Sequence, residues 1–384
     1  MTEILSYLRS REDSWKRMLR EMVEIESPSD DAAAVTRMAE WVAERVAPHA
    51  RVKLFDGKPF GKHLRCEFKL KRAPADRRVV AIGHLDTVWP VGTLKTMPFR
   101  EEAGCVYGPG VFDMKGGISF FLLAMEAIRE LGLKPAAQVT MLLVADEEVG
   151  SLSSRALTEE TARNANLALV LEPAMGTDGK LKTARKGTGL YRVHVQGRPA
   201  HSGIDFEAGA SAVLEMARQV QTIAGFTQLA KGITVNPGVF QGGTKTNVVA
   251  AEAELRGDLR FWKTRDGEAV VRKLRGLRPF DKRCAISVEA GLNRPALERS
   301  AGVRRYFQHA RAIAAELGVP LQEASTGGAS DGNFVGALGV PVLDGIGAVG
   351  DGAHAAHEHI RTDRMPDRAT LLAGLLTHPL PQEP

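Results

Sequence analysis

The chain has 384 residues, of which 44% are hydrophobic and 25% charged, and this length predicts two domains with separate cores. The net charge of +5 is modest, and the basic residues are scattered among few aromatic ones (6%). This composition argues against nucleic-acid binding and favours attraction of a small anionic substrate. No apolar run reaches membrane-spanning length, the charged residues 1–24 contain no signal-peptide pattern, and three widely separated cysteines form no disulfide framework. We therefore expect a cytoplasmic protein that binds no membrane.

Apolar strands and amphipathic helices alternate in the first half of the chain. Helices are predicted over residues 2–25, 31–47 and 116–132, and strands over residues 51–56, 64–70, 78–83, 138–145 and 167–172. Residues 88–110 are rich in glycine and proline and are expected to form a loop. The alternation predicts an α/β architecture with a mainly parallel sheet.

The pattern changes near residue 180 and returns near residue 293. Between these points the sequence predicts a strand at 191–196, a helix at 207–224, strands at 231–240 and 247–261, a helix at 266–277 and a strand at 284–290. This β-α-β-β-α-β order is typical of a ferredoxin-like domain. Beyond it we expect helices at 299–317, 331–338 and 365–378, and strands at 320–325 and 341–346. The prediction is a discontinuous domain of residues 1–181 and 293–384, interrupted by an inserted domain of residues 182–292.

The strand at 78–83 leads into an unusual polar pair. His84 follows the strand directly, and Asp86 comes two residues later. In an extended chain, residues two apart point to the same side. His84 could therefore bind a metal ion while Asp86 holds the imidazole in its ligating tautomer.

Other acids and histidines follow further elements of the α/β region, where such folds place their ligand sites. They are Asp113 after a glycine-rich stretch, Asp146-Glu147-Glu148 and Glu172 after two apolar strands, and His354, His357 and His359 near the end. Each alone is more often structural, but together they supply histidine and carboxylate ligands without cysteine, as zinc or a related divalent ion prefers. Two histidines and three carboxylates exceed what one catalytic zinc accepts, so they favour two ions that share a carboxylate. One acid of the Glu147-Glu148 pair remains as a general base.

Five ordered motifs carry a resemblance to a known family. They are His84-Leu85-Asp86, Gly108-Pro-Gly-Val-Phe-Asp113-Met-Lys-Gly-Gly117, Asp146-Glu147-Glu148-x-Gly150-Ser151, Glu172-Pro173 and Gly197-Arg-Pro-Ala-His201-Ser-Gly203. The chain resembles the co-catalytic di-zinc aminoacylase/carboxypeptidase family, and within it the glutamate carboxypeptidase branch. The resemblance implies a zinc-peptidase-like, three-layer catalytic domain with an inserted ferredoxin-like lid.

The resemblance also implies a role for each motif residue. It implies five ligands of two zinc ions, for which cobalt or manganese could substitute: His84, Asp113, Glu148, Glu172 and His354. Asp113 would bridge the ions, with His84 and Glu172 on one, and Glu148 and His354 on the other. Asp86 would orient His84, and Glu147 would be the general base. His357 is the less favoured alternative to His354.

The inserted domain resembles the lid through which members of the family form homodimers. His201 would reach the neighbouring subunit's site and stabilise the oxyanion. Asn247, Arg260 and the backbone N–H groups at Gly328 would hold the substrate's terminal carboxylate, and Lys180 the side chain of a glutamate. A salt bridge at a strand end is the alternative role for Arg260.

The expected activity is hydrolysis of an amide bond by a zinc-activated water, which releases a carboxy-terminal amino acid, expected to be glutamate. The substrate would be a small N-acyl amino acid or peptide with a free carboxylate. An aminoacylase or a dipeptidase of the same family is the alternative. A serine hydrolase is a weaker one, because Gly328-Ala-Ser330-Asp-Gly332 fits G-x-S-x-G, with Asp344 and His354 following. An inactive binding homologue would not need Glu147.

Overall fold

The computed structural model describes residues 1–379 and 381, and the chain divides into two compact units. The larger unit comprises Met1–Thr183, Arg299–Ser325 and Ser330–Pro384, and the smaller unit comprises Ala184–Glu298 and Thr326–Ala329. The sequence placed the inserted domain at residues 182–292 and offered no sign of the short return at 326–329. Among the described residues, no helix is both long and apolar enough to span a bilayer.

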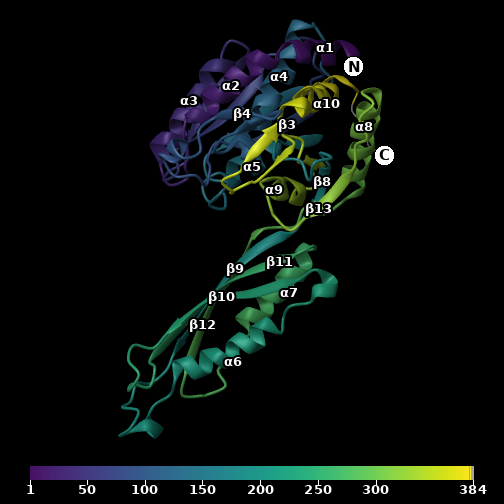
Figure 1. Ribbon diagram of the computed structural model, residues 1–384. Coiled ribbons are helices and arrows are strands. Elements are labelled where there is room, and N and C mark those ends of the chain that lie inside the picture. The colour runs from purple at the N-terminus through teal and green to yellow at the C-terminus, as the bar shows by residue number, and fades with distance from the viewer. Residues whose placement is uncertain (380, 382–384) are drawn as a thin grey trace. The chain divides into compact units, whose positions relative to one another are not determined.

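An eight-stranded sheet forms the centre of the larger unit (Figure 1). Its order is β1-β2-β6-β3-β7-β14-β8-β13. The strands are β1 (Ala50–Asp56), β2 (Lys62–Phe68), β3 (Arg78–His84), β6 (Gln138–Val144), β7 (Leu167–Val170), β8 (Leu181–Arg185), β13 (Glu323–Thr326) and β14 (Val342–Asp344). The neighbours β6, β3, β7 and β14 run parallel, whereas β1–β2, β2–β6 and β14–β8 are antiparallel. The prediction of a mainly parallel sheet therefore holds for the four central strands and is wrong for the flanking ones. β1 and β2, for example, are joined by a short hairpin turn, which allows only antiparallel pairing.

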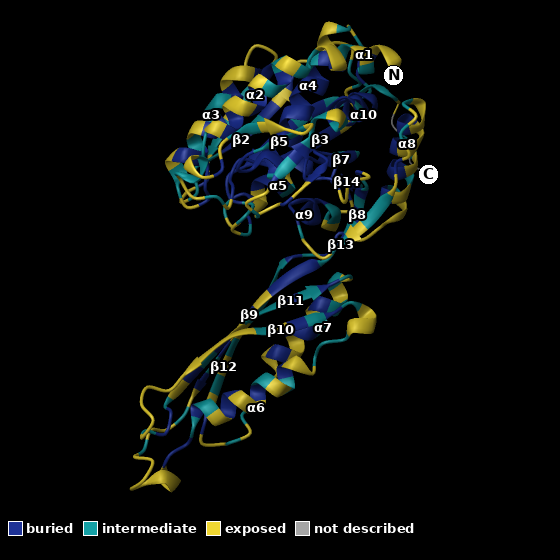
Figure 2. Ribbon diagram, in the orientation of Figure 1, coloured by how far each residue is buried: buried dark blue, intermediate teal, exposed yellow. Residues whose placement is uncertain are grey.

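Helices cover both faces of this sheet, which gives the predicted three layers. On one face, Met141 and Leu143 of β6 join the core formed with α1, α2, α3, α4, α8 and α10. On the other, Leu142 and Val144 pack with Leu157 of α5. The parallel strands are thus buried on both sides, as Figure 2 shows for β3 and β7. The helices are α1 (Thr2–Ser10), α2 (Glu12–Glu24), α3 (Ala32–Val46), α4 (Gly116–Glu130), α5 (Arg155–Ala162), α8 (Ala301–Glu316), α9 (Gly332–Ala337) and α10 (Met365–Thr377).

Two helix predictions need correction. The single opening helix at residues 2–25 is wrong, because α1 and α2 are separated at Arg11. α5 was not predicted at all. The start of α3 follows the expected rule, since the Asp31 carboxylate caps it by accepting the N–H groups of Ala33 and Ala34.

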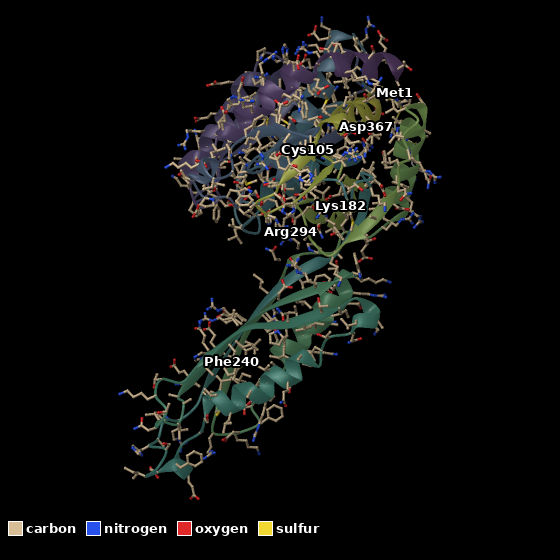
Figure 3. The ribbon with its side chains drawn as sticks, viewed as in Figure 1. Met1, Cys105, Lys182, Phe240, Arg294 and Asp367 are labelled. Carbon is tan, nitrogen blue, oxygen red and sulfur yellow. The ribbon has the colours of Figure 1, made fainter. Side chains whose placement is uncertain are left out.

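A second, smaller sheet of the larger unit was missed. It has the order β15-β16-β5-β4, from strands β4 (Arg100–Glu102), β5 (Cys105–Tyr107), β15 (Gly350–Asp351) and β16 (His359–Arg361). Cys105, labelled in Figure 3, pairs with Arg361 across β5 and β16. Residues 88–110 are therefore more than a loop, and this sheet places the segment near residue 358 beside the segment that leads to Asp113.

The smaller unit has the predicted ferredoxin-like order. Its strands are β9 (Gly187–Gln196), β10 (Thr234–Gly242), β11 (Glu252–Phe261) and β12 (Ala285–Arg294), and its helices are α6 (Ala212–Ala224) and α7 (Thr264–Arg275). The sheet order is β10-β11-β9-β12 with antiparallel pairing throughout. Tyr191, Val193 and Val195 alternate along β9 and form the core with the two helices.

Candidate metal centre

Three neighbouring parallel strands deliver three of the candidate ligands. His84 ends β3, Glu148 follows β6, and Glu172 follows β7. β6, β3 and β7 are adjacent and parallel, so their carboxyl ends lie along one edge of the sheet. The predicted ligands therefore converge on that edge.

Asp113 reaches the same edge from the turn before α4. Residues Val111–Lys115 form an irregular turn, in which Asp113 and Met114 have non-helical backbone angles. The turn begins after Gly110, whose φ of 72° is costly for any residue with a side chain. Gly117, in the first turn of α4, packs directly against β7, since an added Cβ would lie 1.9 Å from the Leu171 carbonyl oxygen. This close approach brings the turn with Asp113 beside Glu172.

The five predicted ligands form two groups that share Asp113. In the first, His84 Nε2 lies 3.1 Å from Asp113 Oδ1 and 3.6 Å from Glu172 Oε1. In the second, His354 Nε2 lies 3.4 Å from Asp113 Oδ2 and 3.3 Å from Glu148 Oε1. Each group has its candidate ligand atoms within 4.8 Å of one another. The two oxygens of Asp113 thus face different histidines, as a bridging carboxylate would.

The imidazole of His84 is held in one tautomer. Its Nδ1 lies 2.9 Å from the backbone oxygen of Asp86, which can only accept, so Nδ1 carries the proton and Nε2 is left to bind a metal ion. The Asp86 carboxylate is farther away, 3.4 Å from Nδ1. The backbone of Asp86, more than its side chain, therefore orients the ring.

The Asp86 carboxylate has another task that sequence reasoning missed. Its oxygens accept the N–H groups of Glu147 and Glu148 at 3.2 and 3.1 Å and the hydroxyl of Ser29 at 2.7 Å. It thereby fixes the backbone of the proposed general base and of one ligand after β6.

Glu358 is a second supporting carboxylate, and sequence reasoning gave it no role at the site. It is fully buried. Oε1 accepts the N–H groups of Phe112 and Asp113, and Oε2 accepts those of Gly110 and the Trp89 indole, at 2.7–3.0 Å. Burial raises the pKa of Glu358, and these four donors oppose that rise. The carboxylate therefore ties the turn that carries Asp113.

The electrostatics of the cluster suit cations. The nearby carboxylates of Asp113 and Glu148 raise the pKa of His354 to about 10, although burial opposes them. Burial raises the pKa of Glu148 itself. Glu148 Oε1 is buried and has no hydrogen-bond partner in the described structure, although His354 Nε2 lies near it. An orphaned carboxylate oxygen among two histidines and two more carboxylates fits divalent metal ions.

Comparison with known proteins identifies the family. The model of peptidase family M20/M25/M40 matches residues 80–378. The chain belongs to this family. It is therefore a metal-dependent hydrolase of peptide bonds, and the resemblance drawn from the five motifs is confirmed.

Individual relatives agree with this assignment. Carboxypeptidase G2 of Pseudomonas sp. (strain RS-16) is 30% identical over 304 residues, which cover 78% of this chain and 73% of that protein. Succinyl-diaminopimelate desuccinylase of Acidovorax ebreus (strain TPSY) is 26% identical over 316 residues, covering 75% of this chain and 76% of that protein. The crystal structure of aminopeptidase PepT from Bacillus cereus ATCC 10987 has the same fold, with a TM-score of 0.79, 20% identity, and coverage of 95% and 98% of the two chains.

The predicted substrate-binding residues of this M20-family chain are divided between the two units. His201, Asn247, Arg260 and Gly328 belong to the smaller unit. Arg260 Nε donates to both oxygens of Asp258, at 2.9 and 3.1 Å, so the salt bridge at a strand end, which was the alternative role for Arg260, is present. His201 is exposed and accepts the N–H of Gly203 at its Nδ1. Lys180 belongs to the larger unit, with Nζ 3.5 Å from Asp178.

The serine-hydrolase alternative does not match the structure. Ser330 is fully buried, and its hydroxyl donates to Asp344 at 2.6 Å. The histidine required by that alternative, His354, instead contacts Asp113 and Glu148. A nucleophile needs an exposed hydroxyl within reach of a base, so the pattern G-x-S-x-G here forms a structural turn.

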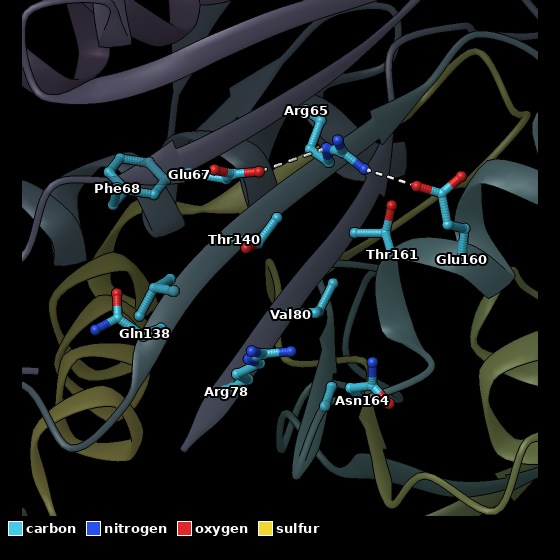
Figure 4. A pocket seen from close by; sticks show the side chains of 12 residues that line it. Arg65, Glu67, Phe68, Arg78, Val80, Gln138, Thr140, Glu160, Thr161 and Asn164 are labelled. Carbon is cyan, nitrogen blue, oxygen red and sulfur yellow. Dashed lines mark hydrogen bonds and ion pairs between the residues drawn. The ribbon is translucent and has the colours of Figure 1, made fainter. Parts of the chain in front are cut away.

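A separate cavity of the larger unit, of about 360 Å³, lies at the opposite edge of the sheet (Figure 4). Arg78 and Gln138, the first residues of β3 and β6, line it, whereas the metal ligands follow the last residues of these strands. Arg65 in this cavity is paired with Glu67 and Glu160. The cavity is therefore separate from the metal ligands, and its arginine, Arg65, already has carboxylate partners.

Proposed function

We propose that this M20-family peptidase is a two-metal amide hydrolase that releases a carboxy-terminal amino acid, with glutamate as the leading candidate, from an N-acyl or peptidyl substrate. The observation that carries the proposal is the position of Asp113, whose two oxygens face two separate histidine–carboxylate groups. The likeness to carboxypeptidase G2 supports release of a carboxy-terminal residue. Zinc is the ion that this donor set fits best, with cobalt or manganese as substitutes.

His84, Glu172 and Asp113 would hold one ion, and Asp113, Glu148 and His354 the other. Divalent ions there would polarise the scissile carbonyl and lower the pKa of a water molecule. Glu147 is next to Glu148, and its backbone is fixed by Asp86. We assign it the role of taking the proton from water and delivering it to the leaving amine.

Substitution of the proposed base tests this mechanism. In Glu147→Gln we expect metal content equal to that of the wild type and a kcat lower by about 10²–10⁴, which is the usual contribution of general acid–base catalysis. The measurements are metal analysis after gel filtration and steady-state kinetics. A variant that keeps its metal and turns over within threefold of the wild type, an order-of-magnitude margin well below that contribution, would remove Glu147 from the mechanism.

The substrate is tested by a hydrolysis screen with zinc, cobalt or manganese added. The panel contains N-acyl-glutamates, other N-acyl amino acids and dipeptides. Preference for carboxy-terminal glutamate supports the carboxypeptidase assignment. Preference for short acyl groups on varied amino acids would favour an aminoacylase, the second candidate, which the likeness to a desuccinylase supports.

The proposal includes a homodimer in which His201 of one subunit stabilises the oxyanion in the other. Asn247, Arg260 and Gly328 would bind the substrate carboxylate, and Lys180 a glutamate side chain. Mixing His201→Ala with Glu147→Ala should restore part of the activity through hybrid dimers. If mixed dimers form without recovery, the site is not shared between subunits.

A further inference from the structure

The exposed apolar side chains of the larger unit are confined to one place in its fold. Among its described residues, only five large apolar side chains are exposed, by 38–71%: Val88, Val91, Val149, Leu152 and Met175. All five lie in the three loops that directly follow β3, β6 and β7. These are the loops that begin at the predicted metal ligands. Exposed apolar groups gathered at a site mark a binding surface more often than scattered ones do.

These residues are close in sequence to the candidate ligands. Val88 and Val91 follow His84 by four and seven residues, and Met175 follows Glu172 by three. Val149 is next to Glu148, and Leu152 is four residues beyond it. Because β6, β3 and β7 are adjacent and parallel, the loops emerge along the same edge of the sheet. We call these five residues the apolar rim.

Hydrogen bonds fix the loops of the apolar rim. In the first loop, the Trp89 indole donates to Glu358 at 2.7 Å. In the second, the N–H of Gly150 donates to the Glu147 carbonyl at 3.0 Å, and the Ser151 hydroxyl bonds to Asp331. In the third, Met175 and Lys180 exchange both backbone hydrogen bonds. The backbone that carries the apolar side chains is therefore held in place, which reduces the entropy cost of binding.

The first two of these loops carry little positive charge. Residues 85–95, 147–154 and 173–180 contain only two cationic side chains, Lys95 and Lys180. Lys180 lies 3.5 Å from Asp178. Arg364 lies against the third loop and donates to the carbonyl oxygens of Thr177 and Asp178, so a second carboxylate is disfavoured at the first two loops only. An apolar group there would remove exposed apolar surface from water.

We propose that the first two loops of the apolar rim bind the acyl side of the substrate, and that this side is an apolar group larger than acetyl, such as a long alkanoyl or an aromatic acyl group. This inference rests on the proposed amide hydrolysis and names the substrate class of that site. It concerns the part of the substrate on the other side of the scissile bond from the released amino acid. Val149 and Leu152, beside the proposed base, are its main specificity-determining residues.

An acyl series on one amino acid tests the proposal. The released amino acid is held constant, and the acyl group is varied from acetyl through butanoyl to octanoyl and benzoyl, using the metal-loaded wild-type enzyme. We expect kcat/KM to rise with apolar size by about tenfold or more, since one or two buried methylenes give discrimination of that order. An equal kcat/KM across the series, or a preference for acetyl or succinyl, would overturn the proposal.

Substitutions at the apolar rim provide the second test. In Leu152→Ser and Val149→Ser, the ratio of kcat/KM for octanoyl to that for acetyl should fall by about fivefold to tenfold, and Leu152→Met should retain it. Leu229→Ser, which alters an equally exposed leucine of the smaller unit, should leave the ratio unchanged. An unchanged ratio in the rim variants would show that the rim does not contact the acyl group and would overturn the proposal. An unchanged ratio together with an altered oligomeric state would show that the rim contacts protein instead.

Failure of this inference and failure of the proposed function are distinguishable. If no N-acyl amino acid or peptide in the series is hydrolysed, the proposed function is wrong. If acetyl and octanoyl substrates are hydrolysed equally well, the amide hydrolase stands and the role of the apolar rim falls.

Discussion

Glu358→Gln is a sharp test of how the candidate metal centre is supported, because it removes a charge without changing the shape of the side chain. The carboxylate accepts two N–H groups at each oxygen, from Phe112 and Asp113 at one, and from Gly110 and Trp89 at the other. The NH2 group of a glutamine cannot accept. Whichever way the amide lies, two hydrogen bonds are lost and two buried N–H groups face a donor.

The magnitude follows from these contacts. A hydrogen bond to a charged group contributes about 1.5–3 kcal/mol, so two of them contribute about 3–6 kcal/mol. Loss of the buried charge offsets part of this, since burial raises the pKa of Glu358. We therefore expect the free energy of unfolding to fall by about 3 kcal/mol, the lower end of that range, and metal affinity to fall by about 10–100-fold because the turn that carries Asp113 loses two of the four hydrogen bonds that hold it or its neighbour Trp89.

Urea unfolding in the presence of EDTA measures the first quantity, and titration with zinc or cobalt measures the second. Trp89→Phe removes one donor only and should destabilise by about half as much. Glu159→Gln is a matched control, because Glu159 forms a surface pair with Arg155 worth under about 1 kcal/mol. If Glu358→Gln unfolds within about 1 kcal/mol of the wild type, the size of a single ordinary hydrogen bond, and binds metal equally well, the four hydrogen bonds do not support the site.

Three further predictions concern other parts of the larger unit. Removal of metal with EDTA should lower Tm and abolish hydrolysis, and zinc, cobalt or manganese should restore both, since ligands that bind only the folded state stabilise it; an unchanged Tm would argue against a metal site. Ser330→Ala should destabilise the fold by about 1–3 kcal/mol, because Asp344 loses a buried donor, while kcat stays near the wild-type value; loss of turnover in a folded, metal-loaded variant would revive the serine mechanism. Burial lowers the pKa of His63 in the folded state below the value of about 6.5 expected in the unfolded chain. Because the unfolded chain then binds a proton more readily, the free energy of unfolding should fall as pH drops below about 6.5, by up to about 1.4 kcal/mol per pH unit. His63→Asn should remove that part of the slope in urea unfolding at pH 5–7.5, and identical slopes would contradict the assignment.

The sequence predicted much of the ligand set because the physics of parallel strands is local. A buried strand is recognisable as an apolar run, and its carboxyl end lies where a ligand site forms. His84, Glu148 and Glu172 could therefore be placed near one another from the apolar runs that precede them. The distances between them along the chain carry no such information.

The small sheet could not be predicted for the opposite reason. β15 (Gly350–Asp351) and β16 (His359–Arg361) are too short to show an alternating pattern. Their pairing depends on contacts with β5, more than two hundred residues earlier. The break between α1 and α2 at Arg11 was hidden as well, since the apolar periodicity continues on both sides of it.

The hardest distinction for sequence reasoning is that between a carboxylate that binds the metal and one that holds the ligands. Asp86 and Glu358 stand two and four residues after the candidate ligands His84 and His354, and nothing in their residue type separates the two roles. The structure separates them by what faces each oxygen. Asp86 and Glu358 accept backbone N–H groups of the segments that carry Glu147, Glu148 and Asp113, so their lone pairs are already used. Glu148, by contrast, has a buried oxygen with no hydrogen-bond donor, beside a histidine, and that is the position of an oxygen reserved for a cation.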